Sequence, residues 1–108
     1  MPPGLPVRPG RPFFAAHRGA SDRELENSPS AFSLAAAEGA DMIEFDIRLS
    51  SDGVPVVLHD EATGRTAKEN LAAARTPWER LRKVPLKNGE PIPSLADVLD
   101  LVRGRVPL

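Results

Sequence analysis

Hydrophobic and polar residues alternate strictly along residues 43–49, with apolar side chains at the odd positions and charged side chains between them. A period of two is typical of a β-strand, and it predicts that the odd-numbered residues share one face. Residues 54–59 follow after a short break and are almost all apolar up to the final histidine. Such a run favours a strand that is buried on both faces.

The dipeptide Asp52-Gly53 lies between these two runs and is a strong signal for a β-hairpin. If these two residues form the turn, Asp46 faces His59 and Arg48 faces Val57 across the two strands. The hairpin would then bring His59 next to the charged face of the first strand.

A helix is predicted in the segment before this hairpin. Ser28 is a good N-cap, Pro29 suits the first helical position, and Gly39 suits the position just after the last turn. A short apolar run at residues 13–17 precedes the helix and predicts a strand. Strand, loop and helix in this order are the opening of a parallel α/β unit.

Two further helices are predicted after the hairpin. The sequence of residues 76–79 (TPWE) reads as a capping box that opens a short helix to about Arg82. Ser94 opens a second helix, whose apolar stripe runs to residue 102 and which Gly104 ends. Residues 105–108 read as the beginning of another strand.

Composition narrows the classes of protein that the chain can represent. Its 108 residues are 41% hydrophobic and 27% charged, as in one globular domain, and a net charge of −1 argues against a nucleic-acid partner. Without cysteine the chain has no disulfide or thiolate metal site, and no apolar run is long enough to span a membrane. Residues 1–12 are rich in proline and glycine, which predicts an extended arm rather than a secretion signal, so a cytoplasmic protein is expected.

Four polar residues stand where predicted buried segments end, and together they suggest chemistry. Glu44 and Asp46, two positions apart on a strand, would point to the same face about 7 Å apart, within reach of one hard cation. His17 and His59 close apolar runs on either side of them. Two imidazoles beside a cation held by carboxylates would make a phosphoryl-transfer site.

Several motifs together resemble the N-terminal signature of glycerophosphodiester phosphodiesterases, and the resemblance extends from about residue 13 to residue 102. They are His17-Arg18-Gly19, Glu26-Asn27-Ser28, Gly39-Ala40-Asp41, Ile43-Glu44-Phe45-Asp46, Asp52-Gly53, Val56-Val57-Leu58-His59-Asp60, Arg65-Thr66 and Ile92-Pro93-Ser94-Leu95. The resemblance implies an α/β fold that is the N-terminal part of a TIM-barrel-like (PLC-like phosphodiesterase) fold. Residues 13–108 would then form an incomplete barrel after the arm of residues 1–12.

The same resemblance implies hydrolysis of a small-molecule glycerophosphodiester to glycerol 3-phosphate and an alcohol, with a divalent metal ion, Mg²⁺ or Ca²⁺. It makes Glu44 and Asp46 metal ligands and Arg18 a phosphate-binding residue. His17 and His59 would be the catalytic acid and base, roles that suit imidazoles because they titrate near neutral pH.

Glu26 and Asn27 are expected to orient Arg18 or His17. The family's third metal-binding carboxylate lies on a strand beyond residue 104, so a catalytically inactive remnant without a complete metal site remains an alternative. A phospholipase D similar to spider toxins, on a related barrel, is a weaker one. An incomplete barrel exposes a sheet edge and apolar faces, so self-association of the 108-residue chain is expected.

Overall fold

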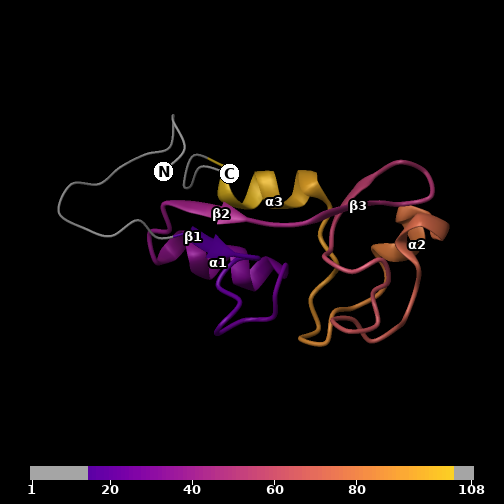
Figure 1. The fold of residues 1–108 in the computed structure, drawn as a ribbon, viewed down its shortest axis with the longest axis horizontal. Coiled ribbons are helices and arrows are strands. Elements are labelled where there is room, and N and C mark those ends of the chain that lie inside the picture. The colour runs from indigo at the N-terminus through magenta and orange to yellow at the C-terminus, as the bar shows by residue number, and fades with distance from the viewer. Residues whose placement is uncertain (1–14, 104–108) are drawn as a thin grey trace.

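The computed structural model describes residues 15–103, so the predictions for residues 1–12, for the start of the first strand and for residues 104–108 fall outside the described part. Figure 1 shows the arrangement of the elements. In chain order they are β1 (Ala15–His17), α1 (Pro29–Ala37), β2 (Met42–Glu44), β3 (Ile47–Leu49), β4 (Pro55–Val57), the 3₁₀ helix η1 (Ala73–Arg75), α2 (Trp78–Leu81) and α3 (Leu95–Val102).

The predicted parallel α/β opening is confirmed. β1 pairs with β2 in parallel, and α1 connects the two strands. The side chain of Ser28 accepts a hydrogen bond from the backbone of Ala31, at 3.2 Å. Gly39 has φ of +75°, and the N–H groups of Gly39 and Ala40 close the last turn of α1 on Ala36 and Ala35. This is the glycine-terminated helix end that the sequence predicts.

The β3–β4 hairpin is confirmed, but its predicted register is wrong by one residue. Arg48 pairs with Val56, and the backbone of Asp46 accepts a hydrogen bond from Leu58 rather than facing His59. The turn has three residues, 51–53, because Ser50 and Val54 form the closing pair. A type I turn followed by a glycine with positive φ gives such a three-residue hairpin, and Gly53 has φ of +81°.

The predicted continuous strand of residues 43–49 is interrupted at Phe45 and Asp46. Beyond this break the odd-numbered apolar side chains are not buried, since Ile47 is 45% and Leu49 58% exposed. β4 is the only strand that pairs with β3 in the described part, and Figure 1 shows β3 running toward α2 and away from α1. The side chains of β3 therefore lie beyond the main core.

The predicted capping box at residues 76–79 is not formed. The hydroxyl of Thr76 donates to the backbone oxygen of Ala72, while the N–H of Trp78 at the start of α2 donates to the carboxylate of Asp52, at 3.0 Å. The hairpin turn thus caps α2 from a distant part of the sequence. The predicted start of α3 is confirmed, since Ser94 and Asp97 form a reciprocal capping box there.

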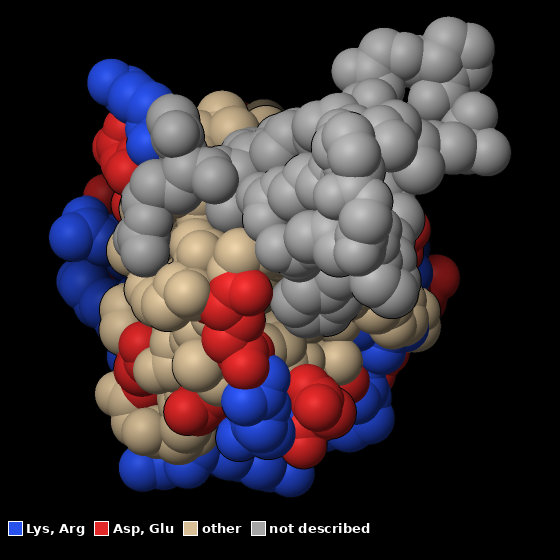
Figure 2. Space-filling model, turned by 90° about the vertical axis from the view of Figure 1, so that its left-hand side faces the viewer, with Lys and Arg blue, Asp and Glu red and all other residues tan. Residues whose placement is uncertain are grey.

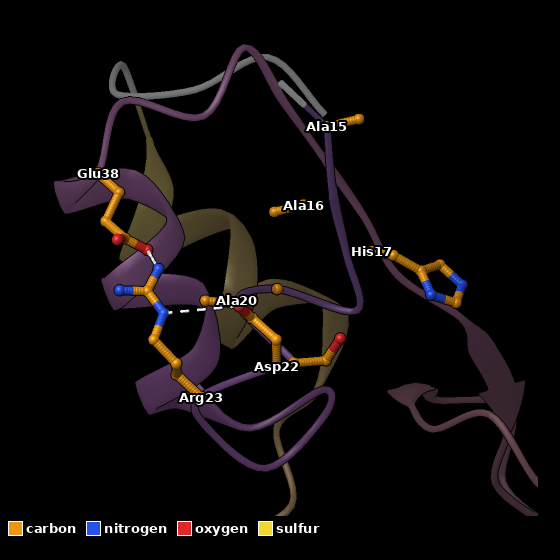
Figure 3. Close-up of a pocket in the computed structure, with 9 residues that line it drawn as sticks. Ala15, Ala16, His17, Ala20, Asp22, Arg23 and Glu38 are labelled. Carbon is orange, nitrogen blue, oxygen red and sulfur yellow. Dashed lines mark hydrogen bonds and ion pairs between the residues drawn. The ribbon is translucent and has the colours of Figure 1, made fainter. Parts of the chain in front are cut away.

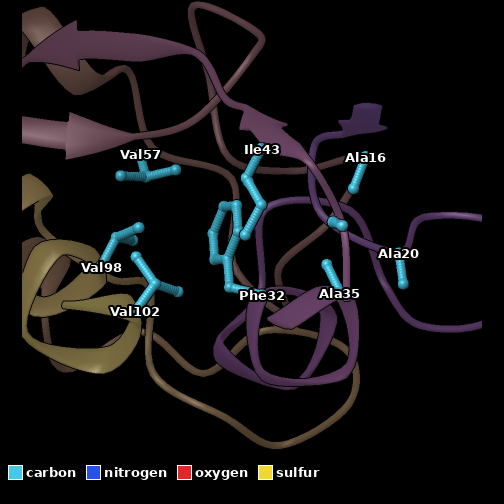
Figure 4. Close-up of a cluster of buried hydrophobic side chains, with 9 residues drawn as sticks. Ala16, Ala20, Phe32, Ala35, Ile43, Val57, Val98 and Val102 are labelled. Carbon is cyan, nitrogen blue, oxygen red and sulfur yellow. The ribbon is translucent and has the colours of Figure 1, made fainter. Parts of the chain in front are cut away.

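Buried hydrophobic side chains form two clusters that meet at β4. The first joins β1, α1, β2 and α3, and Figure 4 shows Val57 directed toward Phe32, Val98 and Val102. The second is built mainly from residues 56–92 and includes Val56 and Leu58. Neighbouring residues of β4 thus enter different clusters, which confirms that this strand is buried on both faces.

Acidic and basic side chains lie next to one another on the face that Figure 2 shows, in keeping with the net charge of −1. Among the helices within residues 15–103, none has the length and apolar character that crossing a lipid bilayer requires.

Candidate active site

His17 and Glu44 stand side by side at the carboxyl ends of the two parallel strands. They are Cα partners in the register of β1 and β2. Side chains alternate along a strand, and the preceding residues Ala16 and Ile43 are buried in the first core cluster. His17 and Glu44 are exposed, so their side chains share the open face of this sheet, away from α1.

One hollow of about 360 Å³ brings together three of the four residues predicted for chemistry. Its lining comprises His17, Met42, Ile43, Glu44, Phe45 and Asp46. The two carboxylates predicted to share a strand face thus line the same space, even though the strand is interrupted between them. His59, the fourth predicted residue, is not part of this lining.

A second hollow, of about 410 Å³, is lined partly by His17, Arg23 and Glu38. Figure 3 shows that the imidazole of His17 points away from Arg23 and Glu38, which form an ion pair with each other. Three of the predicted residues, His17, Glu44 and Asp46, therefore share the first hollow, and we place the candidate site there.

The loop after β1 holds two residues in a backbone conformation that is uncommon for side chains other than glycine. Arg18 has φ of 57° and Asn27 has φ of 54°. The N–H of Arg18 donates to the carbonyl of Glu44, at 2.7 Å, and the N–H of Asn27 donates to the carbonyl of Arg18, at 2.9 Å. Such strained residues gather at functional sites, and here they fix the loop to the end of β2.

Asp46 is held by both of these loop residues. Its Oδ2 atom accepts a hydrogen bond from Nδ2 of Asn27 and lies near Nε of Arg18, at 3.3 Å in both cases. Asn27 is only 5% exposed. Glu26 accepts a hydrogen bond from Nη1 of Arg18, at 3.0 Å. Glu26 thus contacts the side chain of Arg18, and the side chain of Asn27 contacts Asp46.

His59 follows β4 and has its own partners. Its Nδ1 atom lies 2.7 Å from Oδ1 of Asp60, and its backbone oxygen accepts hydrogen bonds from Nε and Nη2 of Arg48, at 3.0 and 2.8 Å. The predicted direct approach of His59 to Asp46 across the hairpin does not occur, because the longer turn places Leu58 opposite Asp46.

Arg65, to which no role was assigned from the sequence, connects the residues around His59 with those around Arg18. It donates to both carboxylate oxygens of Glu26, at 2.6 and 2.8 Å, and to Oδ2 of Asp60, at 2.8 Å. Hydrogen bonds from Arg65 hold the pKa of Glu26 and of Asp60 below their ordinary values, and His59 adds to the effect on Asp60. In return the two carboxylates raise the pKa of Arg65. The only signal in the sequence was its place in the motif Arg65-Thr66.

The donor set suits part of a metal site. Within residues 15–103, no three histidine, aspartate or glutamate side chains come close enough to hold a metal ion. Glu44 and Asp46 nevertheless line one hollow, and carboxylate oxygens are the ligands that Mg²⁺ and Ca²⁺ prefer. The pair fits two positions in the coordination shell of such an ion.

Sequence and structure comparisons with known proteins both identify relatives in one family. The sequence model of the glycerophosphoryl diester phosphodiesterase family matches residues 17–106. The chain is 37% identical over 94 residues to a glycerophosphodiester phosphodiesterase of Caldanaerobacter subterraneus, a match that covers 81% of this chain and 39% of that protein.

Solved structures agree with the sequence comparison. A glycerophosphodiester phosphodiesterase from Agrobacterium tumefaciens superposes with a TM-score of 0.83 at 32% identity, over 89% of this chain and 45% of that one. A phosphodiesterase from Oleispira antarctica, solved in complex with its product sn-glycerol-3-phosphate, gives 0.79 at 31% identity, over 84% and 40%.

The chain spans about two fifths of the length of these relatives. Their folds are TIM-barrel-like, and the predicted fold class is confirmed in that this chain is a partial barrel of the same kind.

Proposed function

The chain belongs to the glycerophosphoryl diester phosphodiesterase family, and from this premise we propose that the protein hydrolyses glycerophosphodiesters to glycerol 3-phosphate and an alcohol, aided by a divalent metal ion. The observation that carries the proposal is the pairing of His17 with Glu44 at the carboxyl ends of β1 and β2, with Asp46 on the same hollow. Active sites of barrel enzymes lie at this end of the strands.

Glu44 and Asp46 are the residues that would hold the metal ion. A bound divalent cation, Mg²⁺ or Ca²⁺, neutralises charge on phosphoryl oxygens during hydrolysis. Such ions take six or more oxygen ligands, so substrate, water and other parts of the protein must complete the shell. Asn27 fixes the Asp46 carboxylate through its hydrogen bond and so prepares one ligand in advance.

Arg18 is the residue proposed to bind the phosphate. Its guanidinium group lies between Glu26 and Asp46 beside the hollow, held by a hydrogen bond to the first and an ion pair with the second. A planar guanidinium offers several N–H donors at a fixed geometry that matches phosphate oxygens. The left-handed backbone of Arg18 places this group over the end of β2.

His17 and His59 are the proposed acid and base. One imidazole takes the proton of the attacking hydroxyl group, and the other gives a proton to the leaving alcohol. His17 lines the hollow itself. His59 lies outside the lining, and a series of side-chain contacts through Asp60, Arg65 and Glu26 connects it to Arg18. The matches to phosphodiesterases of the same family favour an enzyme over an inactive remnant.

The experiment that tests this function uses the protein as its gene encodes it and glycerophosphocholine as the substrate. We expect glycerol 3-phosphate and choline as products, loss of turnover with EDTA, and recovery when Mg²⁺ or Ca²⁺ is added in excess. Release of phosphocholine and glycerol would show cleavage of the other P–O bond, and turnover unaffected by the chelator would contradict the metal. Absence of turnover on every glycerophosphodiester tried would refute the proposal.

A further inference from the structure

A continuous series of charged contacts joins the two parts of the candidate site, and Arg65 is its centre. On one side the series runs from Arg65 through Asp60 to the ring of His59. On the other side it runs through Glu26 to Arg18. Arg65 and Glu26 are 39 positions apart in the sequence, so this contact ties the loop after β4 to the loop after β1.

We propose that Arg65 is a positioning residue that holds Asp60 against His59 and Glu26 against Arg18. It thereby fixes the position of His59 relative to Arg18. This inference rests on the proposed function and adds a residue to it. Arg65 touches neither the hollow nor the phosphate-binding group directly; it acts through the two carboxylates.

The contacts of Asp60 explain how Arg65 acts on His59. One carboxylate oxygen, Oδ1, faces Nδ1 of the imidazole, and the other, Oδ2, accepts the Nε–H of Arg65. An ionised carboxylate can only accept hydrogen bonds, so Nδ1 of His59 carries the proton. The other ring nitrogen, Nε2, is then the one that exchanges a proton with substrate, as in other sites where a carboxylate orients a histidine.

The contacts with Glu26 explain how Arg65 acts on Arg18. Two parallel N–H donors of Arg65 meet the two oxygens of Glu26, the geometry that only a guanidinium group provides. The Oε2 atom of Glu26 in turn accepts from Nη1 of Arg18. Arg65 therefore fixes the orientation of the carboxylate to which Arg18 donates its hydrogen bond.

Stability alone does not account for this arrangement. The Arg65 side chain is 50% exposed and that of its partner Glu26 is 15% exposed, so water screens one side of the pair and its contribution to the free energy of unfolding is modest. Arg80 offers a matched comparison, because it is 46% exposed and pairs with the exposed Glu69 outside the candidate site. The two arginines differ in what their partners contact, which allows a positioning role to be separated from a structural one.

The test compares Arg65→Met, Arg65→Lys and the control Arg80→Met in the protein as its gene encodes it. For Arg65→Met we expect kcat/KM on glycerophosphocholine to fall about 10- to 100-fold, the usual cost of losing a residue that orients a site. Arg65→Lys should recover only part of the loss, since an ammonium group cannot make the two parallel bonds. Arg80→Met should keep wild-type kinetics. Urea unfolding at pH 7 should show that Arg65→Met, like Arg80→Met, is fully folded under the assay conditions, so that its kinetic loss does not come from unfolding.

A second readout does not depend on turnover. The ¹⁵N NMR signals of the neutral His59 ring report which nitrogen carries the proton, and we expect Nδ1–H in the wild type and in Arg80→Met. In Arg65→Met the Nδ1–H population should fall. If the wild type is active, and Arg65→Met and Arg80→Met both show its kinetics and its His59 ring signals, Arg65 has no positioning role. If the wild type hydrolyses no glycerophosphodiester, the proposed function fails, and the ring signals still decide whether Arg65 positions His59.

Discussion

Glu44 and Asp46 line one hollow but have different surroundings, so substitutions at the two positions should differ in their effect on KM. Glu44 ends β2 beside His17, and Asp46 contacts Arg18 and Asn27. We expect Glu44→Gln and Asp46→Asn to lose nearly all turnover and its dependence on the divalent ion, because a neutral amide is a poor ligand for a hard cation. Asp46→Asn should also raise KM, since it removes a partner of Arg18.

The measurement is kcat and KM on glycerophosphocholine over a range of Mg²⁺ concentrations. The exposed Glu61→Gln is the matched control, because its side chain lies outside the hollow that Glu44 and Asp46 line. Equal activity of Glu44→Gln and Glu61→Gln would show that Glu44 is no ligand.

The two histidines should behave differently from the carboxylates. His17→Ala and His59→Ala remove a proton donor or acceptor without removing an oxygen ligand. We therefore expect kcat to fall by about 10² to 10⁴, while calorimetry still detects binding of the divalent ion. Wild-type turnover in either variant would refute the acid and base assignment for that residue.

The loop between β1 and α1 and the turn of the β3–β4 hairpin each contain a glycine, and the roles of the two differ in a testable way. Gly19 and Gly53 both have positive φ, at 79° and 81°. A Cβ at Gly19 would lie 2.8 Å from Ala31 in α1, whereas a Cβ at Gly53 would meet nothing within 4 Å. Gly53→Ala should therefore cost about 1 kcal/mol of unfolding free energy for the left-handed backbone alone.

Gly19→Ala carries the same backbone cost and in addition about 1 to 3 kcal/mol for overpacking against α1. Urea unfolding of the two variants measures the difference. Equal losses would mean that the loop after β1 can move away from α1, and that the backbone of Arg18 is not held as tightly as its hydrogen bond to Glu44 indicates.

Elements defined by neighbouring residues could be predicted, and contacts between distant residues could not. Ser28, Gly39 and Ser94 act on their own helices, so α1 and α3 follow from the sequence. The dipeptide Asp52-Gly53 fits both a two-residue and a three-residue turn, and the observed register came from the second. The cap of α2 was missed because Asp52 lies 26 positions before Trp78.

The candidate site shows the same division. His17 and Glu44 were expected at one site because both stand where predicted buried segments end, and in the structure they are Cα partners on neighbouring strands. The left-handed backbone of Arg18 has no local signal, since such conformations favour glycine. Arg65 could not be assigned either, because it depends on a carboxylate 39 positions away and on another in a separate loop.

Across the molecule, the contacts of Arg65 should also make stability depend on acid. The folded pKa values of Glu26 and Asp60 lie below their ordinary values of 4.5 and 3.8, mainly because of hydrogen bonds from Arg65. As the pH falls, these two carboxylates therefore take up protons at a higher pH in the unfolded chain than in the folded one. Stability from these groups is complete above the ordinary values and declines as the pH falls through and below them.

Urea unfolding between pH 7 and pH 3 measures this decline. Arg65→Met removes the largest cause of both shifts, so its stability should fall less steeply with acid than that of Arg80→Met. Parallel curves for the two variants would show that the carboxylates gain no stability from Arg65.

We propose that the open ends of β1 and β2 form the metal- and phosphate-binding part of a phosphodiesterase site. Anomalous X-ray scattering from Mn²⁺, in crystals of the whole protein grown with glycerol 3-phosphate, tests it most directly. We expect an ion bound by the carboxylates of Glu44 and Asp46, with the phosphate of the product on Arg18 and His17 nearby. An ion bound elsewhere, or a phosphate that leaves Arg18 without contact, would contradict it.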